Sequence, residues 1–167
     1  SGFKIEVPTD LTENIIQRFL AFRFRAQVEF NIIDENIPEK LGNLISKGQP
    51  FIGFEQTEKY TPHMLNLDLI NAVDFKKGCY PGQEVVARIH YKGLSKRRTF
   101  KFKSESKIKV NDKVTCNGQS VGDVLNVYEN NLLAIIPVKM ATRELAVKNS
   151  RLKIDHLPYF DEMINLD

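Results

Sequence analysis

The chain has 167 residues, of which 42% are hydrophobic and 27% are charged, and its formal net charge is +3 at pH 7. This length and composition suit an ordinary soluble globular protein with one or two small domains and a sizeable core. No apolar run approaches the roughly 20 residues that cross a bilayer, and the opening SGFKIEVPTD carries no signal-peptide pattern. We therefore expect no membrane span and no secretory signal. So small a net charge gives by itself no argument for nucleic-acid binding.

The chain has two cysteines and three histidines. These are too few for a disulfide framework, and they make a four-ligand zinc or iron–sulphur site within one chain unfavourable. We therefore expect a reducing, cytoplasmic setting and no metal site. Cys116 lies among residues typical of a strand and is expected to fill a core.

The first part of the chain predicts two helices and a strand. Asp10 and Glu13 resemble a helix-opening capping pair, and apolar residues recur at helical spacing up to Leu20. Apolar and polar residues then alternate strictly over 23–32, which predicts a half-buried strand. A short helix is expected over 39–46, ended by Lys47 and Gly48. Residues 50–70 have a mixed pattern, in which 50–55 is compatible with a short strand and 63–70 favours one or two helical turns. A short strand is expected at 72–75.

After Gly93 the sequence has an all-β character. Short runs rich in Val, Ile, Leu and Phe are separated by turn signals such as Asn117-Gly118. This pattern predicts a small antiparallel barrel or sandwich. We divide the chain into an α+β domain over 1–94, a C-terminal β-barrel domain over 95–157, and an acidic tail or final short helix over 158–167.

The stretch KKGCYPGQEVVARIHYKG, residues 76–93, joins one cysteine to a tight Pro-Gly turn and several basic residues. The turn is expected to open a helix, although a strand also fits the residues that follow it. Cys79 lies beside Lys76 and Lys77 and near the expected helix N-terminus, and both features favour a thiolate. A thiolate suits nucleophilic attack, metal ligation or redox sensing. The alternative is a small buried side chain, which is common for free cysteine.

Residues 76–98 are strongly basic, with Glu84 as their one acid. Such a face attracts phosphates or carboxylates, although solvated charges around a turn remain the alternative. Tyr80 and Tyr91 suit stacking on a flat ring or a place in the core. Glu84 suits a hydrogen bond to a heterocycle, together with Gln83, or pairing with Arg88 along a helix. We assign anion binding to four residues: Lys76, Lys92, Arg97 and Arg98.

The segment KGCYPGQEVVAR, residues 77–88, resembles the K-G-C-Y-x-G-Q-E signature of the YgfZ family. YTPHMLNLDLINAVDF is similar to the family's lead-in to that signature, FRFRAQVEFNIID to its central strand, and NGQSVGDVLNV followed by LLAIIPV to its C-terminal barrel. Members are folate-binding proteins related to the T-protein, the aminomethyltransferase of the glycine cleavage system. They are implicated in iron–sulphur cluster assembly or repair and in the tRNA modification that depends on it.

This resemblance covers roughly residues 10–155 but only part of the family, whose full members are close to twice as long. It implies an α+β fold in which a T-protein-like segment precedes a small antiparallel β-barrel. The N-terminal half, which forms much of the folate-facing cleft in relatives, has no counterpart here. The T-protein's catalytic aspartate lies in that half, so no aminomethyl-transfer acid is carried over.

The resemblance also implies a function and a site. Cys79 would be the essential thiol, with Lys77 as the charge that favours its thiolate. Tetrahydrofolate would be the cofactor, bound by Tyr80, Gln83, Glu84 and Arg88, with its glutamate tail on the basic segment. The partners implied are iron–sulphur proteins or their assembly factors, with contact to tRNA as a further expectation.

Two other functions remain open, namely a folate-dependent aminomethyltransferase-like enzyme and an RNA-binding module. The oligomeric state is not predicted.

Overall fold

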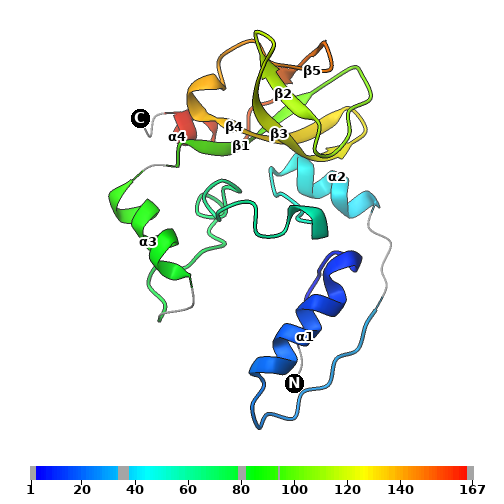
Figure 1. Cartoon of the computed structure of the whole chain (residues 1–167), viewed down its shortest axis with the longest axis vertical. Coiled ribbons are helices and arrows are strands. Elements are labelled where there is room, and N and C mark those ends of the chain that lie inside the picture. The colour runs from blue at the N-terminus through cyan, green and yellow to red at the C-terminus, as the bar shows by residue number, and fades with distance from the viewer. Residues whose placement is uncertain (1–2, 34–37, 79–81, 94, 165–167) are drawn as a thin grey trace.

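The structure is a computed structural model that describes residues 3–33, 38–78, 82–93 and 95–164 (Figure 1). It is an α+β fold with a nearly closed antiparallel barrel. The helical elements are η1 (Thr9–Leu11), α1 (Thr12–Phe22), α2 (Pro38–Ser46), η2 (Phe54–Gln56), α3 (Gln83–Lys92), η3 (Val138–Met140) and α4 (Phe160–Ile164). The strands are β1 (Arg97–Lys103), β2 (Lys113–Cys116), β3 (Gln119–Tyr128), β4 (Asn131–Pro137), β5 (Ala146–Val147), β6 (Ser150–Arg151) and β7 (Lys153–Ile154).

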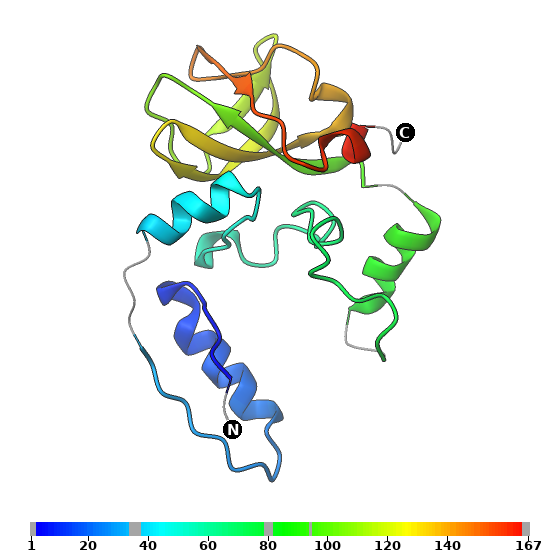
Figure 2. The ribbon, with the colours of Figure 1, turned by 180° about the vertical axis from the view of Figure 1, so that it is seen from behind.

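All seven strands belong to one sheet, in the order β6-β5-β2-β3-β4-β1-β7, with antiparallel neighbours. The two edge strands, β6 and β7, are separated in sequence only by Leu152. The chain itself therefore joins the two edges and curls the sheet into a barrel (Figures 1 and 2). Register shifts in β2–β3 and β3–β4 help the strands to bend. At Gly122 a Cβ would lie 2.2 Å from the Ile135 carbonyl oxygen, so this close approach requires glycine.

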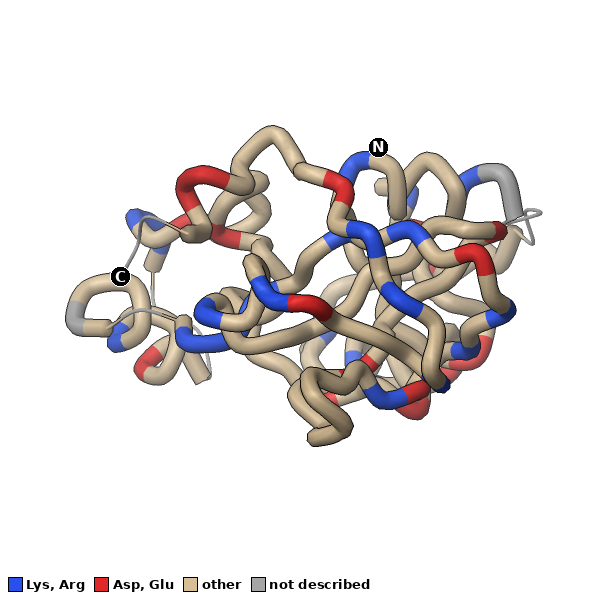
Figure 3. Tube along the Cα trace, turned by 90° about the horizontal axis from the view of Figure 1, so that it is seen from above, with Lys and Arg blue, Asp and Glu red and all other residues tan. Residues whose placement is uncertain are grey.

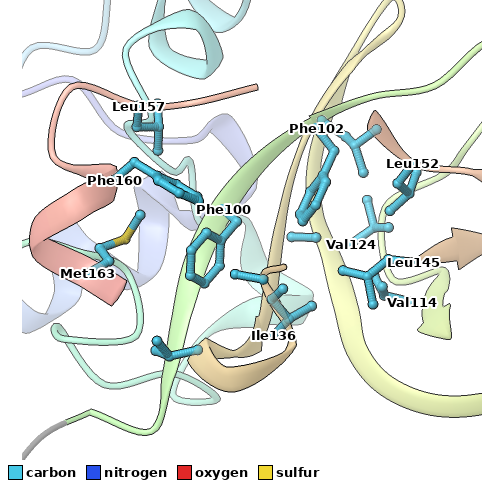
Figure 4. Packing of buried hydrophobic residues seen from close by; sticks show 14 of the residues in the cluster. Phe100, Phe102, Val114, Val124, Ile136, Leu145, Leu152, Leu157, Phe160 and Met163 are labelled. Atoms are coloured by element: carbon cyan, nitrogen blue, oxygen red, sulfur yellow. The ribbon is translucent and has the colours of Figure 1, made fainter. Parts of the chain in front are cut away.

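The core fills the barrel and continues under the C-terminal helix (Figure 4). Phe100 is fully buried in β1, and its ring lies edge-on to Phe160 of α4 at 6.0 Å. Burying a side chain of this kind stabilises the fold by about 1.5–3 kcal/mol. Tyr159, Phe160 and Met163 are buried, so the segment expected to be an acidic tail or short helix contains a helix that closes the core.

Helix α2 covers another face of the barrel through Ile45, which packs in a second cluster with Leu125 and Leu133. The predicted end of this helix at Gly48 is confirmed. Gly48 has a φ of 69°, and its carbonyl accepts a hydrogen bond from the Tyr159 hydroxyl at 3.1 Å. The helix C-terminus is thus tied to the last helical segment of the chain.

The α+β class, the helices at 12–22 and 38–46 and the barrel are confirmed. The T-protein-like character of the first part and the domain boundary remain predictions. Two predicted strands are wrong, because residues 23–32 and 72–75 have no strand partner among the described residues. The alternative of a short strand at 50–55 is not seen either, since part of this stretch forms η2. Within the described residues, no helix combines the length and apolar character needed to span a membrane.

Candidate functional site

Residues 75–78 together with α3, here called the arm, carry most of the predicted site. The predicted helix is confirmed: α3 begins at Gln83, directly after Gly82, whose φ of 83° only glycine adopts readily. Cys79 and Tyr80, the predicted thiol and one of the predicted ring contacts, lie outside the described residues, as does Pro81. The structure therefore describes the residues on either side of the predicted thiol but not the thiol itself.

The described charged side chains of the arm face solvent. Lys76, Lys77, Glu84 and Arg88 are exposed. The carboxylate of Asp74 accepts a hydrogen bond from the Lys76 N–H at 2.8 Å, which forms a tight turn just before the signature. Glu84 and Arg88 form no ion pair with each other or with other described residues, so the predicted helical pairing between them is not seen.

Aromatic packing holds the arm together. The rings of Phe75 and His90 stack at a centroid distance of 3.5 Å and an angle of 9°, and Tyr91 lies edge-on to His90 at 4.7 Å. Tyr91 is 68% exposed, which leaves one of the predicted stacking rings open to solvent. Phe75 was not among the predicted site residues, because nothing in the sequence shows that its ring meets a histidine of α3.

His63 lies beneath this packing, 6.0 Å from the Phe75 ring. Its side chain is 2% exposed, and neither ring nitrogen has a hydrogen-bond partner among the described residues. Burial lowers the pKa of His63, and Arg98 and His90 lower it further, against the opposing pull of Asp68. The imidazole is therefore held neutral at the junction of the arm and the barrel.

A buried polar seam joins the lead-in segment 61–70 to β1, and Arg98 is its centre. The Arg98 guanidinium donates to both oxygens of Asp68, at 3.0 and 2.9 Å, and to the His63 carbonyl at 3.1 Å. The amide of Asn66 and the hydroxyl of Thr99 complete the seam by donating to the backbone of the opposite segment. This seam fixes the start of the motif region on the barrel.

The sequence analysis assigned Arg98 to anion binding, and this assignment stays a prediction. Arg98 is 3% exposed and its charge is already paired with Asp68. Arg97 also belongs to the barrel, where its guanidinium lies 3.8 Å from Asp123. The side chain of Lys92, the remaining predicted anion contact of α3, lies outside the description. Figure 3 shows basic and acidic positions interspersed along most of the trace, so the predicted basic face is divided between the arm and the barrel.

A separate hollow of about 250 Å³ lies between η2 and the barrel. Asp10 and Glu55 line it together with Phe54 and Asn111. Both carboxylates are engaged, Asp10 by the Phe54 N–H at 2.8 Å and Glu55 by the Asn111 amide at 3.0 Å. None of the predicted site residues lines this hollow, and its acidic wall does not suit an anionic ligand.

Comparison with curated proteins finds several relatives named tRNA-modifying protein YgfZ, whereas no family model matches the chain. The protein of Colwellia psychrerythraea is 34% identical over 148 residues, which cover 74% of this chain and 46% of the relative. That of Buchnera aphidicola subsp. Schizaphis graminum is 32% identical over 130 residues, covering 73% and 38%. That of Vibrio atlanticus is 34% identical over 93 residues, covering 51% and 29%. The chain thus spans less than half the length of these relatives.

Proposed function

The signature and the similarity to these relatives place the chain in the YgfZ family, and on this basis we propose that it takes part in tRNA modification. In this proposal it is a tetrahydrofolate-binding accessory protein that supports iron–sulphur cluster assembly or repair, on which the tRNA-modifying enzymes depend. The observation that carries the proposal is the complete signature KGCYPGQE in a chain whose relatives are named for tRNA modification.

The proposed thiol is Cys79. Lys76 and Lys77 precede it, and the first turn of α3 follows it within a few residues. Both the lysine charges and the unpaired N–H groups at a helix start stabilise an anion. A thiol that follows the two lysines and precedes the helix in the sequence is expected to ionise more readily than an isolated cysteine. A thiolate suits attack on an electrophile or transient binding of a cluster iron.

Tetrahydrofolate is the proposed cofactor, and the arm offers groups that suit it. Arg88 is exposed and forms no ion pair with a described residue, so its planar guanidinium is open to a carboxylate of the glutamate tail. Gln83 and Glu84 of the same helix supply donors and acceptors for the amide-like edge of the pterin ring. Tyr80 would stack on the ring, as the resemblance implies.

The first test is genetic rescue. Cells that lack their YgfZ protein receive the protein, its Cys79→Ser variant or its Cys116→Ser variant, at equal abundance. The activity of a cluster-dependent tRNA-modifying enzyme is measured from the content of its modified nucleoside. Cys116 is the matched control, because it lies half-buried in β2, away from the arm.

We expect the unchanged protein and Cys116→Ser to restore modification, and Cys79→Ser to fail. Replacing sulphur by oxygen changes the size of the side chain little but removes an ionisable thiol. Equal rescue by both variants would show that the thiol is not required. The function would then have to depend on the charged and aromatic residues of the arm alone.

A further inference from the structure

The arm meets the segment held on β1 at an aromatic junction. The ring of Phe75 lies 6.0 Å from the ring of His63, whose backbone carbonyl accepts a hydrogen bond from the Arg98 guanidinium of β1. On the side of the arm, His90 stacks on Phe75 at 3.5 Å, and Tyr91 packs edge-on to Phe75 at 6.5 Å. Phe75 therefore links α3 to a residue that is fixed to the barrel.

Helix α3 makes little use of the core for its stability. Among its described side chains only that of Val86 is buried, and neither core cluster includes a residue of α3. Figures 1 and 2 show α3 at the flank of the molecule, apart from α1 and α2. A helix of 10 residues is marginal in water when it stands alone. The position and stability of α3 should therefore depend largely on the aromatic junction.

The buried imidazole of His63 makes this junction costly to keep closed. The side chain is 2% exposed, and neither Nδ1 nor Nε2 has a hydrogen-bond partner among the described residues. Buried polar atoms are almost always hydrogen-bonded, and an unpaired one destabilises the state that buries it. Water would satisfy both nitrogens if the arm moved away. The closed junction thus opposes a free-energy cost even while the ring is neutral.

A proton on His63 would raise this cost further. The charged and titratable groups that act on the ring come from three elements: Asp68 of segment 61–70, Arg98 of β1 and His90 of α3. Arg98 is 3% exposed, and both oxygens of Asp68 already accept hydrogen bonds from it. A protonated His63 would therefore be a second buried cation beside a carboxylate that is already paired. His90 differs, because its ring is exposed and a cation over the face of Phe75 is attracted to it.

We propose that this junction is a proton-sensitive latch, in which neutral His63 keeps Phe75 and α3 docked and protonated His63 releases them. Burial, the largest cause, lowers the pKa of His63 in the docked state, whereas release to water returns that pKa towards 6.5. Docking is therefore complete above pH 6.5 and is lost as the pH falls through the lower, docked-state pKa. The latch sets where the arm lies, whatever the arm binds, so it goes beyond the proposed function.

Hydrogen exchange of the α3 amides, residues 87–92, tests the latch in the whole chain at pH 7.5, 6.5 and 5.5. Rates are expressed as protection factors, which remove the intrinsic pH dependence of exchange, and the amides of β3 and β4 are the internal reference. One linked proton changes an equilibrium at most about ten-fold per pH unit. Between pH 6.5 and pH 5.5 we expect the protection of α3 to fall at least about three-fold, within that limit, while β3 and β4 keep theirs.

Three substitutions identify the group that responds. His63→Phe keeps a ring that cannot take up a proton, so α3 should stay protected at pH 5.5. His90→Phe is the matched control, because it keeps an aromatic stack on Phe75 and removes the other histidine of the junction. It should retain the fall in protection. Phe75→Ala removes the ring that both histidines meet, and it should lower α3 protection at least about ten-fold already at pH 7.5.

Three outcomes would overturn the proposal. Equal losses of protection in α3, β3 and β4 at low pH would show that acid loosens the whole fold and not the arm. Loss of the pH dependence in His90→Phe, with its retention in His63→Phe, would make His90 the responding group. Unchanged α3 protection in Phe75→Ala would show that the junction does not hold the arm, and this result decides the matter even if His63→Phe does not fold.

Discussion

The barrel and the α1 region, residues 12–33, have similarly regular sequence patterns but opposite burial. In β4 the residues from Leu132 to Ile136 are almost completely buried between β1 and β3. In α1 no residue is buried, and the alternating segment after it exposes Phe24 and Ile32. The difference is that every barrel strand pairs with neighbouring strands, whereas residues 23–33 pair with no strand in the part of the chain that the structure describes.

This comparison shows what an amphipathic pattern specifies. A pattern determines which face of an element must be covered, but burial and hydrogen bonding come from the element that covers it. The segment 61–70 is an intermediate case. It has no regular strand or helix, yet the buried bonds of Asn66 and Arg98 hold it on β1. The stability of an element should therefore depend on the element that covers it and not on the regularity of its sequence.

The largest expected effect comes from the same change made in each region. Phe100→Ala removes a fully buried ring from the barrel and should lower the free energy of unfolding by about 3–5 kcal/mol. Phe24→Ala removes a ring that is 88% exposed and should change it by less than about 0.5 kcal/mol. Urea titration followed by circular dichroism measures both. Equal losses would contradict the contrast between the two regions.

The next effect tests the seam that attaches segment 61–70. Arg98→Ala leaves the Asp68 carboxylate nearly buried without its partner, which should cost about 3–5 kcal/mol. Arg97→Ala is the matched control, because Arg97 precedes Arg98 in the same strand, its side chain is 38% exposed and its carboxylate partner lies 3.8 Å away. We expect the control to cost less than about 1 kcal/mol in urea titration. A smaller loss for Arg98→Ala than for Arg97→Ala would show that the seam does not hold the segment.

Much of the barrel could be predicted because its signals are local. Asn117 and Gly118 both have positive φ, at 50° and 77°, and they join β2 to β3 as the predicted turn. The end of α2 at Gly48 also follows from a local rule. The strand over 23–32 failed because pairing needs a neighbour, and its alternation carries no information on whether one is present.

The site was predicted less well, because its contacts are distant in sequence. Arg98 was grouped with the basic residues near it, but its partner Asp68 lies 30 residues away. The stack of Phe75 on His90 joins two residues on opposite sides of the signature. Exposure of Lys76 and Arg88 agrees with the predicted basic character of the arm, whereas the roles assigned to Cys79 and Tyr80 stay predictions.

The smallest expected effect is a change in the pH dependence of stability, which tests the junction between the arm and the barrel. The folded-state pKa of His63 is lowered, first by burial, so below pH 6.5 the unfolded chain binds a proton at this residue more readily than the folded chain. The contribution of the neutral His63 imidazole to stability is complete above pH 6.5. The loss begins as the pH falls below 6.5 and ends once the pH has passed the lower folded-state pKa.

We therefore expect the free energy of unfolding to fall between pH 7.5 and pH 5, and His63→Phe to remove part of that fall. His156→Gln is the control, because that ring stacks on Phe160 at 4.0 Å and belongs to the far side of the core. Ion pairs with lysines hold the pKa values of the Asp112 and Asp155 carboxyl groups below the usual range, against the opposing effect of burial. These two groups therefore lose their contribution to stability only at lower pH. If His63→Phe left the pH dependence unchanged, the buried imidazole would have to be protonated in the folded state. A charge beside Arg98 would then need an anion to balance it, and Asp68, whose carboxylate acts on His63, is already bound to Arg98.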